Sequence, residues 1–265
     1  MLLESIACCQ YAQLANNNPY SPFPIPHSLL PTPFYVFAAK GIGSHFERVN
    51  LMEYRNILFD LDGTLTDPYL GITNAVKYSL QKFNIEERNE NTLRAIIGPP
   101  LETSFMEFYQ FDANKTKTAI GYYREYYSEK GIYENKLYPD IDTILAKIRD
   151  AGKTLILATS KPAIFASKIL EYFNIDKYFY DITGSNLDGT LVEKDEIIKF
   201  IMEKHDLKPE TTIMIGDRKY DISGAHKNNI HSIAVMYGYG SKEELEQSKP
   251  TYFCENTADI WEIIR

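Results

Sequence analysis

Two aspartates, Asp60 and Asp62, stand directly after the apolar run Ile57-Leu58-Phe59, with only Leu61 between them. Two carboxylates this close repel each other and lose hydration, so burying them together costs free energy unless a cation lies nearby. The apolar run is typical of a buried strand, and a strand would carry both aspartates into the protein. The rest of the chain should therefore supply positive charge close to this pair.

Three further segments bring polar side chains to the end of an apolar run or to the start of a helix. Thr159 and Ser160 end the strand-like run 154–160. Lys194 precedes a helical stripe of isoleucines. Asp217 ends the run 211–217, and Asp221 follows one helical turn later. Four carboxylates suit Mg²⁺, and a lysine with hydroxyls suits phosphate, so these residues together indicate phosphoryl transfer with a carboxylate nucleophile.

The elements that must position these residues alternate between strand and helix from residue 141 onward. We expect helices at 141–151, 162–173, around 197–201, from 217 to about 229 and around Trp261, and strands at 55–61, 154–160, 178–183, 211–217 and 231–236. Pro162 suits the first turn of its helix, and Cys254 is expected in a late strand as a buried thiol. This rhythm predicts an α/β fold, a doubly wound parallel sheet with helices on both faces. In such a sheet the ligand site lies beyond the carboxyl ends of the strands, where the residues above would meet.

A separate helical segment interrupts this alternation after the first strand. The apolar spacing predicts helices at 70–84, 92–97, 101–108 and 114–130, with no strand among them. We therefore expect residues 52–68 and 136–265 to form the sheet-containing core and residues 69–135 to form an all-helical module. Gly98-Pro99-Pro100 either shapes a loop of this module that faces the site or only ends a helix.

Four stretches, "DLDGTLTD", "LILATSKP", a lysine at a helix start and "IMIGDRKYD", resemble the motifs of the haloacid dehalogenase (HAD) superfamily of phosphohydrolases. The helical module resembles the α-helical cap of one class in that superfamily. Within it the chain is similar to 5′-nucleotidases and phosphoglycolate phosphatases, and "IIGPPLETSF", "YENKLYPDI", "GSNLDGTLVEK" and "GDRKYDISGA" favour the 5′-nucleotidase branch. The resemblance implies a Rossmann-like HAD core with an inserted cap, a Mg²⁺ cofactor and a small phosphorylated metabolite as substrate.

The resemblance also implies a role for each matching residue. Asp60 attacks the phosphorus and becomes an aspartyl phosphate, and Asp62 protonates the leaving alcohol and then activates water. Thr159 binds the transferring phosphoryl group, and Lys194 stabilises the charge on Asp60. The implied metal ligands are Asp60, the backbone carbonyl of Asp62, Asp217 and Asp221. The expected substrate-binding residues are Leu61, Gly63, Thr64, Ser160 and Arg124.

Several of these assignments have alternatives. Lys161 is a rival of Lys194 for the catalytic lysine. Arg124 either reaches the distal part of the substrate or forms a surface ion pair, and the tyrosines of "GYYREYY" are expected in the core. Arg218 and Lys219 are expected on the surface. The histidines show no spacing typical of metal ligands and are expected to be structural or exposed.

Composition limits the remaining possibilities. The 265 residues carry a net charge of −8, which argues against a nucleic-acid polymer or an anionic membrane as partner. No apolar run approaches the roughly 20 residues that span a bilayer. Cys8, Cys9 and Cys254 provide no disulfide framework, so we expect a reducing cytoplasm. The oligomeric state stays open.

Residues 1–51 differ from the rest, because prolines recur through 19–33 beside Asn16-Asn17-Asn18. This composition predicts a disordered leader. The alternative hypothesis is that this extension is not natural protein and that Met52 is the true start.

The favoured function is a Mg²⁺-dependent phosphomonoester hydrolase, a 5′-nucleotidase acting on nucleoside monophosphates. Phosphoglycolate hydrolysis, or hydrolysis of another small phosphorylated metabolite, is the alternative within enzymes. A non-catalytic phosphate-binding regulatory module is the alternative from a different class.

Overall fold

The structure is a computed structural model that describes residues 53–265, all of which belong to one compact unit. The predictions for residues 1–51 and for Met52 lie outside the described residues. None of the helices in the described part is both long enough and apolar enough to cross a lipid bilayer.

A six-stranded parallel sheet in the order β5-β4-β1-β6-β7-β8 forms the centre of the described chain. Its strands are β1 (Asn56–Phe59), β4 (Thr154–Pro162), β5 (Asp181–Ser185), β6 (Thr212–Gly216), β7 (His231–Val235) and β8 (Tyr252–Cys254). The helices that alternate with them are α6 (Ile141–Asp150), α7 (Ala163–Tyr172), α8 (Lys194–Lys204), α9 (Lys219–Lys227), α10 (Lys242–Ser248) and α11 (Thr257–Ile264). The α/β fold class predicted from the alternation is confirmed.

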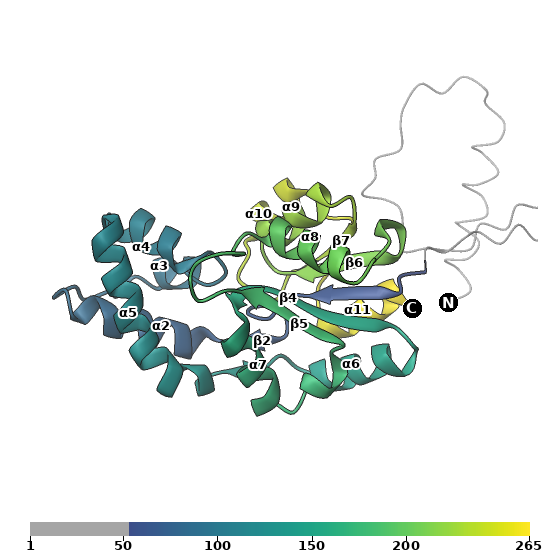
Figure 1. The fold of residues 1–265 in the computed structure, drawn as a ribbon, viewed down its shortest axis with the longest axis horizontal. Coiled ribbons are helices and arrows are strands. Elements are labelled where there is room, and N and C mark those ends of the chain that lie inside the picture. The colour runs from purple at the N-terminus through teal and green to yellow at the C-terminus, as the bar shows by residue number, and fades with distance from the viewer. Residues whose placement is uncertain (1–52) are drawn as a thin grey trace, which may run out of the picture. The chain divides into compact units, whose positions relative to one another are not determined.

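Strand β1 is apolar because both of its faces are covered. Ile57 and Phe59 pack in a cluster with α6, α7 and α11, whereas Leu58 packs in a second cluster with α8 and α9. Figure 1 shows α8, α9 and α10 on one face of the sheet and α6, α7 and α11 on the other. A strand buried on both faces reads as a continuous apolar run, which explains the sequence pattern of this segment.

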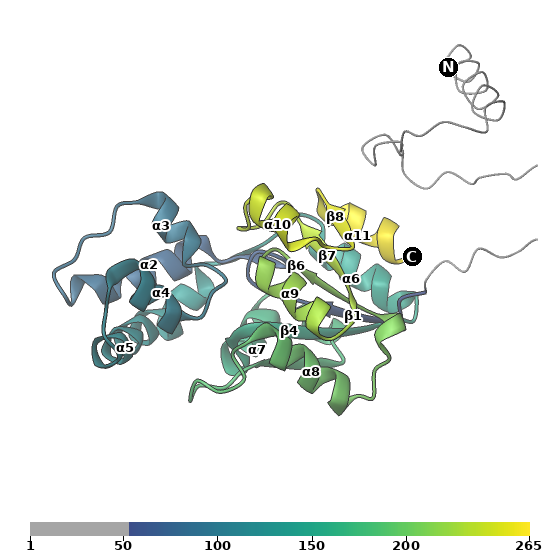
Figure 2. The same cartoon turned by 90° about the horizontal axis from the view of Figure 1, so that it is seen from above.

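The chain switches direction across the sheet at β1. It passes from β1 to β4 and β5 on one side, and then returns to β6, β7 and β8 on the other (Figure 2). The carboxyl end of β1 therefore lies between those of β4 and β6, although β1 ends at Phe59, β4 at Pro162 and β6 at Gly216. This topology brings the polar residues after these three strands to one place.

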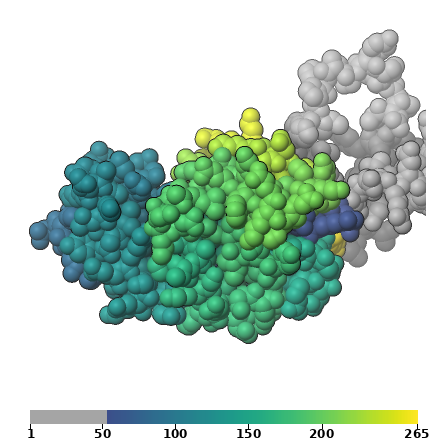
Figure 3. Space-filling view, in the orientation of Figure 1, coloured from purple at the N-terminus to yellow at the C-terminus, as the bar shows by residue number. Residues whose placement is uncertain are grey.

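Between the first strand and α6 the chain forms a helical insertion, by which we mean residues 69–135. Its helices are α2 (Tyr69–Gln81), α3 (Glu90–Ala95), α4 (Leu101–Tyr109) and α5 (Ala113–Glu129). Side-chain caps define two of their starts, since Asn89 accepts hydrogen bonds from the first turn of α3 and Asp112 from that of α5. In the space-filling view the insertion, in blue and teal, lies directly against the sheet-containing part, in green (Figure 3).

The insertion leaves and rejoins the sheet region through a short antiparallel pair, β2 (Thr66–Asp67) and β3 (Lys136–Leu137). Thr66 pairs with Leu137, and Asp67 pairs with Lys136. The side chains of Lys136 and Asp67 also form an ion pair at 3.1 Å. The two connections are thus held side by side.

Some predicted boundaries were wrong. Strand β4 continues to Pro162 rather than ending at Ser160, and Pro162 precedes α7 instead of lying in its first turn. Strand β5 begins at Asp181, because residues 176–178 form a 3₁₀ turn in which Tyr178 donates to Asp142 at 2.9 Å. Helix α10 was not predicted.

Candidate active site

A cavity of about 390 Å³ lies between the carboxyl edge of the sheet and the helical insertion. From the sheet side it is lined by Asp60, Asp62, Thr159, Ser160 and Lys161. From the insertion it is lined by the loop Gly98-Pro99-Pro100 and by Tyr123, Arg124 and Tyr127 on α5. The Gly98-Pro99-Pro100 loop and Arg124 thus face the site. This agrees with the alternative in which the loop shapes the site and Arg124 reaches toward the substrate.

Three buried carboxylates, Asp60, Asp217 and Asp221, form a cluster at the carboxyl edge of the sheet. Each offers one oxygen, and these oxygens all lie within 4.8 Å of one another. Burial raises the pKa of Asp217 well above its ordinary value, and the charges of Asp221 and Asp60 raise it further. Burial also raises the pKa of Asp221 to about 6, an effect that Lys194 opposes and Asp60 reinforces. The three side chains therefore favour the arrival of a positive charge.

The donor set of this cluster fits a hard divalent cation. Oδ1 of Asp217 is buried and accepts no hydrogen bond, whereas the buried Oδ1 atoms of Asp60 and Asp221 have the ammonium group of Lys194 beside them. Oδ2 of Asp217 accepts from the backbone N–H of Tyr239 at 2.7 Å, and Oδ2 of Asp221 accepts from that of Arg218 at 3.0 Å. Asp217 is thus oriented through Oδ2 while its Oδ1 remains available as a ligand, and Asp221 is oriented through Oδ2 while its Oδ1 faces Lys194. Buried oxygen ligands of this kind are what Mg²⁺ and Ca²⁺ prefer.

Lys194 lies beside the cluster as the first residue of α8. Its Nζ is 2.9 Å from Oδ1 of Asp60 and 2.8 Å from Oδ1 of Asp221, and it donates to the carbonyl of Ala158 at 2.9 Å. Burial alone would lower the pKa of Lys194, but the charges of Asp221 and Asp60 raise it above its ordinary value. The lysine is therefore charged and directed at the first aspartate.

Lys161 contacts the second aspartate. Its ammonium group forms an ion pair with Oδ2 of Asp62, and both side chains are largely buried. The same ammonium lies 4.8 Å from the centre of the Tyr127 ring. The two lysines were treated as rivals for one role, but each lies beside its own carboxylate. The position of Lys161 directly after Thr159 and Ser160 was the sequence signal for its place at the site.

An irregularity at the end of β4 shapes this part of the site. Pairing with β5 shifts register between Thr159 and Pro162, as in a β-bulge. Oγ1 of Thr159 accepts from the backbone N–H of Lys161 at 3.3 Å, and the carbonyl of Ser160 accepts from Ser185 at 2.8 Å. Bulges redirect side chains at sheet edges, and here all four residues of the irregular segment, 159–162, line the cavity.

The turn after β1 is held by its own backbone. The carbonyl of Leu61 accepts from the N–H groups of Leu65 at 2.9 Å and Thr66 at 3.0 Å. Gly63 has φ +85°, and a Cβ atom there would lie 2.5 Å from Cγ of Asp217. Leu61, Gly63 and Thr64 do not line the cavity, whereas Ser160 and Arg124 do. The lack of a side chain at Gly63 thus allows Asp217 to lie directly against the turn.

Helix α5 places an aromatic pair over the site. The rings of Tyr123 and Tyr127 stack with centroids 5.3 Å apart, and both side chains are buried as expected, whereas Tyr122 and Tyr126 are only partly buried. The Tyr127 hydroxyl is buried without a hydrogen-bond partner. Arg124 donates to the carbonyl of Leu187 at 3.3 Å rather than to a carboxylate.

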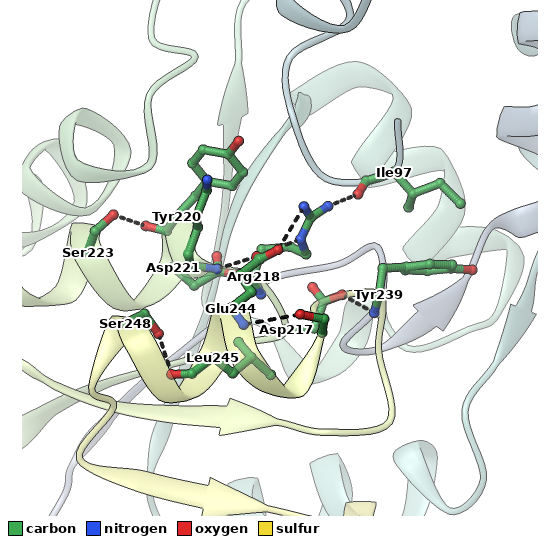
Figure 4. Close-up of polar contacts among 12 residues, drawn as sticks. Ile97, Asp217, Arg218, Tyr220, Asp221, Ser223, Tyr239, Glu244, Leu245 and Ser248 are labelled. Atoms are coloured by element: carbon green, nitrogen blue, oxygen red, sulfur yellow. Dashed lines mark hydrogen bonds and ion pairs between the residues drawn. The ribbon is translucent and has the colours of Figure 1, made fainter. Parts of the chain in front are cut away.

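The surface location predicted for Arg218 was wrong. Arg218 is 8% exposed and pairs with Glu244 on the unpredicted helix α10, whereas Lys219 is exposed as predicted. Figure 4 shows Arg218 between Glu244 and the carbonyl of Ile97. The sequence signal for a position near the site was that Arg218 stands between Asp217 and Asp221, since a residue directly after Asp217 cannot lie far from it.

Histidines in the described part take structural or exposed positions, as predicted. Nε2 of His205 lies 2.8 Å from Asp181, and Nδ1 of His231 lies 3.0 Å from the hydroxyl of Tyr54. His226 is exposed. Cys254 is the last residue of β8 and is buried, as predicted.

The comparisons with known proteins agree with this geometry. The family model described as haloacid dehalogenase-like hydrolase matches residues 57–235. A 5′-nucleotidase from Pseudomonas aeruginosa is 42% identical over 213 residues, which cover 80% of this chain and 96% of that protein. A phosphoglycolate phosphatase from Vibrio parahaemolyticus is 28% identical over 216 residues, covering 78% of this chain and 95% of that protein.

A solved structure supports the same conclusion. The crystal structure of a predicted phosphatase from Clostridium acetobutylicum has a TM-score of 0.78 and 48% identity, covering 80% of this chain and 98% of that one. The prediction of a phosphomonoester hydrolase is thereby confirmed. The chain belongs to the family of haloacid dehalogenase-like hydrolases.

Proposed function

We propose that this enzyme hydrolyses phosphomonoesters through an aspartyl phosphate on Asp60, depends on Mg²⁺ and acts on nucleoside 5′-monophosphates. The observation that supports this most directly is the position of Asp60. Its carboxylate lines the cavity, contacts Lys194 at 2.9 Å and belongs to the carboxylate cluster. The proposed nucleophile thus lines the cavity and at the same time contacts a cation and two further carboxylates that could hold a metal.

The proposed metal ligands are Asp60, Asp217, Asp221 and the backbone carbonyl of Asp62. When bound, Mg²⁺ would neutralise the carboxylates and the phosphoryl oxygens, so that the negatively charged substrate can approach. The division into a core, residues 52–68 and 136–265, and a cap, residues 69–135, is part of this proposal, with the cap selecting the leaving group.

In the first half-reaction a carboxylate oxygen of Asp60 forms a bond to phosphorus while the bond between phosphorus and the ester oxygen breaks. Lys194 holds Asp60 in place and balances the charge that gathers on the phosphoryl group. The hydroxyl of Thr159 donates to a phosphoryl oxygen. Such positioning and charge stabilisation account for most of the catalysis in phosphoryl transfer.

Asp62 moves the protons. Burial raises the pKa of Asp62, although Lys161 opposes this effect, so the carboxyl group can hold a proton nearer to neutral pH. It gives that proton to the departing ester oxygen, which leaves as an alcohol. It then takes a proton from water, whose oxygen attacks the phosphorus, and inorganic phosphate and free Asp60 are formed.

The size and the walls of the cavity favour a nucleoside as the leaving group. The rings of Tyr123, Tyr127 and Phe165 and the side chain of Ile72 line it, and aromatic faces suit a planar base. The relative named 5′-nucleotidase is also the more similar of the two reported above. Phosphoglycolate is the second candidate, because the guanidinium of Arg124 lines the cavity and could pair with its carboxylate.

A substrate panel tests the proposal. We expect kcat/KM for at least one nucleoside 5′-monophosphate to exceed the values for phosphoglycolate and sugar phosphates. A preference for phosphoglycolate would favour the second candidate. Failure to release phosphate from any member of the panel, or from p-nitrophenyl phosphate, would favour a regulatory phosphate-binding module. We further propose that the enzyme works in the cytoplasm.

A further inference from the structure

Arg218 is a buried cation that the mechanism does not use. Its side chain is 9% exposed and lies at the start of α9, directly after Asp217. All hydrogen bonds that its guanidinium donates go to residues outside α9, namely Glu244 and Ile97 (Figure 4). A charge placed at such a position costs free energy unless it is fully paired, so these contacts define what Arg218 does.

The first partner is Glu244 in the first turn of α10. Nε of Arg218 donates to Oε1 at 2.9 Å and Nη2 donates to Oε2 at 3.3 Å. Oε1 also accepts from the backbone N–H of Lys219 at 2.9 Å. Burial alone would raise the pKa of Glu244, but the hydrogen bonds from Arg218 and Lys219 lower it, so the carboxylate is ionised. This two-point pairing fixes the plane of the guanidinium.

The second partner belongs to the helical insertion. Nη1 of Arg218 donates to the backbone carbonyl of Ile97, just after α3. The next residue, Gly98, has φ +110°, and a Cβ atom there would lie 2.9 Å from Nη1 and 3.0 Å from Cγ of Arg218. The backbone of this loop thus rests directly on the guanidinium. Without Arg218 the Ile97 carbonyl would lose a charged hydrogen-bond partner in a buried place.

The loop held by Arg218 is a wall of the cavity. Gly98, Pro99 and Pro100 line the cavity, and Asp60 and Asp62 line its other side. This contact is separate from the β2–β3 connection, which joins the insertion to the sheet region through Asp67 and Lys136. The position of the guanidinium therefore sets how far this wall stands from the catalytic carboxylates.

We propose that Arg218 is a positioning residue that fixes the Ile97–Pro100 loop over the cavity and so determines the binding of the leaving group. The size of the effect on substrate binding rests on the proposed function, whereas the effect on the loop does not. The metal-binding loop does not need the side chain, because Asp221 is oriented by the backbone N–H of Arg218. Replacing the side chain should leave that hydrogen bond in place.

Two variants break the link in different ways. Arg218→Lys keeps the charge, but one ammonium group cannot pair with Glu244 at two points and also reach Ile97. Glu244→Gln keeps the shape of the partner and removes its charge, and it also serves if Arg218→Lys does not fold. Lys219→Gln is the matched control, because Lys219 is the next residue along the chain and its side chain is exposed.

The first measurement is hydrogen exchange followed by mass spectrometry, which needs no activity. We expect peptides that cover residues 90–105 to exchange about tenfold faster in Arg218→Lys and Glu244→Gln, with peptides from α8 unchanged. The Lys219→Gln control should match the wild type throughout. Unchanged exchange of residues 90–105 in both variants would overturn the proposal, whether or not the proposed substrate is correct.

The second measurement separates substrate binding from metal binding. For the preferred substrate we expect KM to rise about tenfold in both variants while kcat changes by less than about threefold. The Mg²⁺ concentration for half-maximal activity should stay unchanged. A higher Mg²⁺ requirement with unchanged KM would instead place the role of Arg218 in the metal-binding loop and overturn the proposal.

Discussion

Gly63 and Asp217 pack so closely that a Cβ atom on Gly63 would lie 2.5 Å from Cγ of the aspartate. Gly63 also has φ +85°, a backbone conformation that other residues adopt only with strain. The turn after β1 and the end of β6 are thus in direct contact through a residue without a side chain. This contact gives the first prediction.

Gly63→Ala should destabilise the protein by about 3 kcal/mol, from steric overlap and backbone strain together. Gly152→Ala is the matched control, because Gly152 has φ +78° but nothing lies within 4 Å of its Cβ position. We expect this control to lose only about 1 kcal/mol. Urea unfolding curves measure both values, and equal losses in the two variants would show that the contact with Asp217 is not the cause.

Asp60→Asn should lower kcat on p-nitrophenyl phosphate by at least about 10³-fold, because an amide oxygen is a poor nucleophile. The replacement keeps the size of the side chain, so we expect an unchanged circular dichroism spectrum. A variant that folds and still releases phosphate at the wild-type rate would contradict the role of Asp60.

Lys161→Gln should lower kcat by about tenfold or more, because it removes the ion pair that holds Asp62 in place and favours the carboxylate form that must take a proton from water. Lys161→Arg retains a positive charge and should restore part of the loss. Lys168→Gln, in the middle of α7 and outside the cavity, is the control. If both Lys161 variants keep the wild-type kcat, the ion pair has no part in the reaction.

Asp217→Asn should make the metal-free protein more stable and reduce the stability that Mg²⁺ adds. In EDTA we expect the variant to have the higher Tm, because it removes a carboxylate whose pKa is raised by burial and by Asp221 and Asp60. In 10-fold excess of Mg²⁺ over Kd, the wild type gains about 1.4 kcal/mol by mass action and the variant gains less.

Differential scanning calorimetry with and without Mg²⁺ checks this prediction. Asp188→Asn is the control, since Asp188 is exposed and is not one of the clustered carboxylates. A wild-type Tm that does not change when Mg²⁺ is added would contradict the proposed metal site.

Asp181 should make stability depend on pH on the acid side. Burial alone would raise its pKa, but hydrogen bonds from Lys204, His205 and Thr183 lower it below the ordinary value of 3.8. A carboxylate with a lowered folded-state pKa stabilises the protein above its unfolded-state pKa and loses this contribution as the pH falls through its folded-state pKa. Asp181→Asn should therefore cost about 1 kcal/mol at pH 6 and progressively less below pH 3.8.

Urea unfolding at a series of pH values from 6 down to the acid-unfolding limit measures this difference. Asp150→Asn is the control, because Asp150 pairs only with its exposed neighbour Arg149. A stability difference between Asp181→Asn and wild type that stays constant with pH would contradict the prediction.

The sequence was sufficient to predict the sheet and three of the four expected members of the acidic cluster, whereas the side chain of Asp62, the fourth, pairs with Lys161 instead. Buried parallel strands are continuous apolar runs, and their carboxyl ends must meet at a switch point, so Asp60, Thr159 and Asp217 could be brought together without coordinates. Lys194 could be placed for the same reason, since it starts a helix that follows a strand.

Contacts that depend on side-chain direction could not be predicted. Arg218 sits between Asp217 and an exposed lysine, and charged residues after a strand are usually solvated. Only the unpredicted helix α10 brings Glu244 to it. Strand β5 was placed too early because an aromatic run such as Tyr178-Phe179-Tyr180 has the same composition in a strand and in a packed turn.

The antiparallel pairing of Thr66–Asp67 with Lys136–Leu137 has an evolutionary consequence. Since the chain exits and re-enters the sheet region at adjacent points, the intervening segment can be lengthened, shortened or exchanged between related genes without altering the spacing of the catalytic strands. Under the proposed function, such changes would remodel the cavity walls that this segment supplies, provided that the contact between Arg218 and the Ile97 carbonyl is kept or replaced.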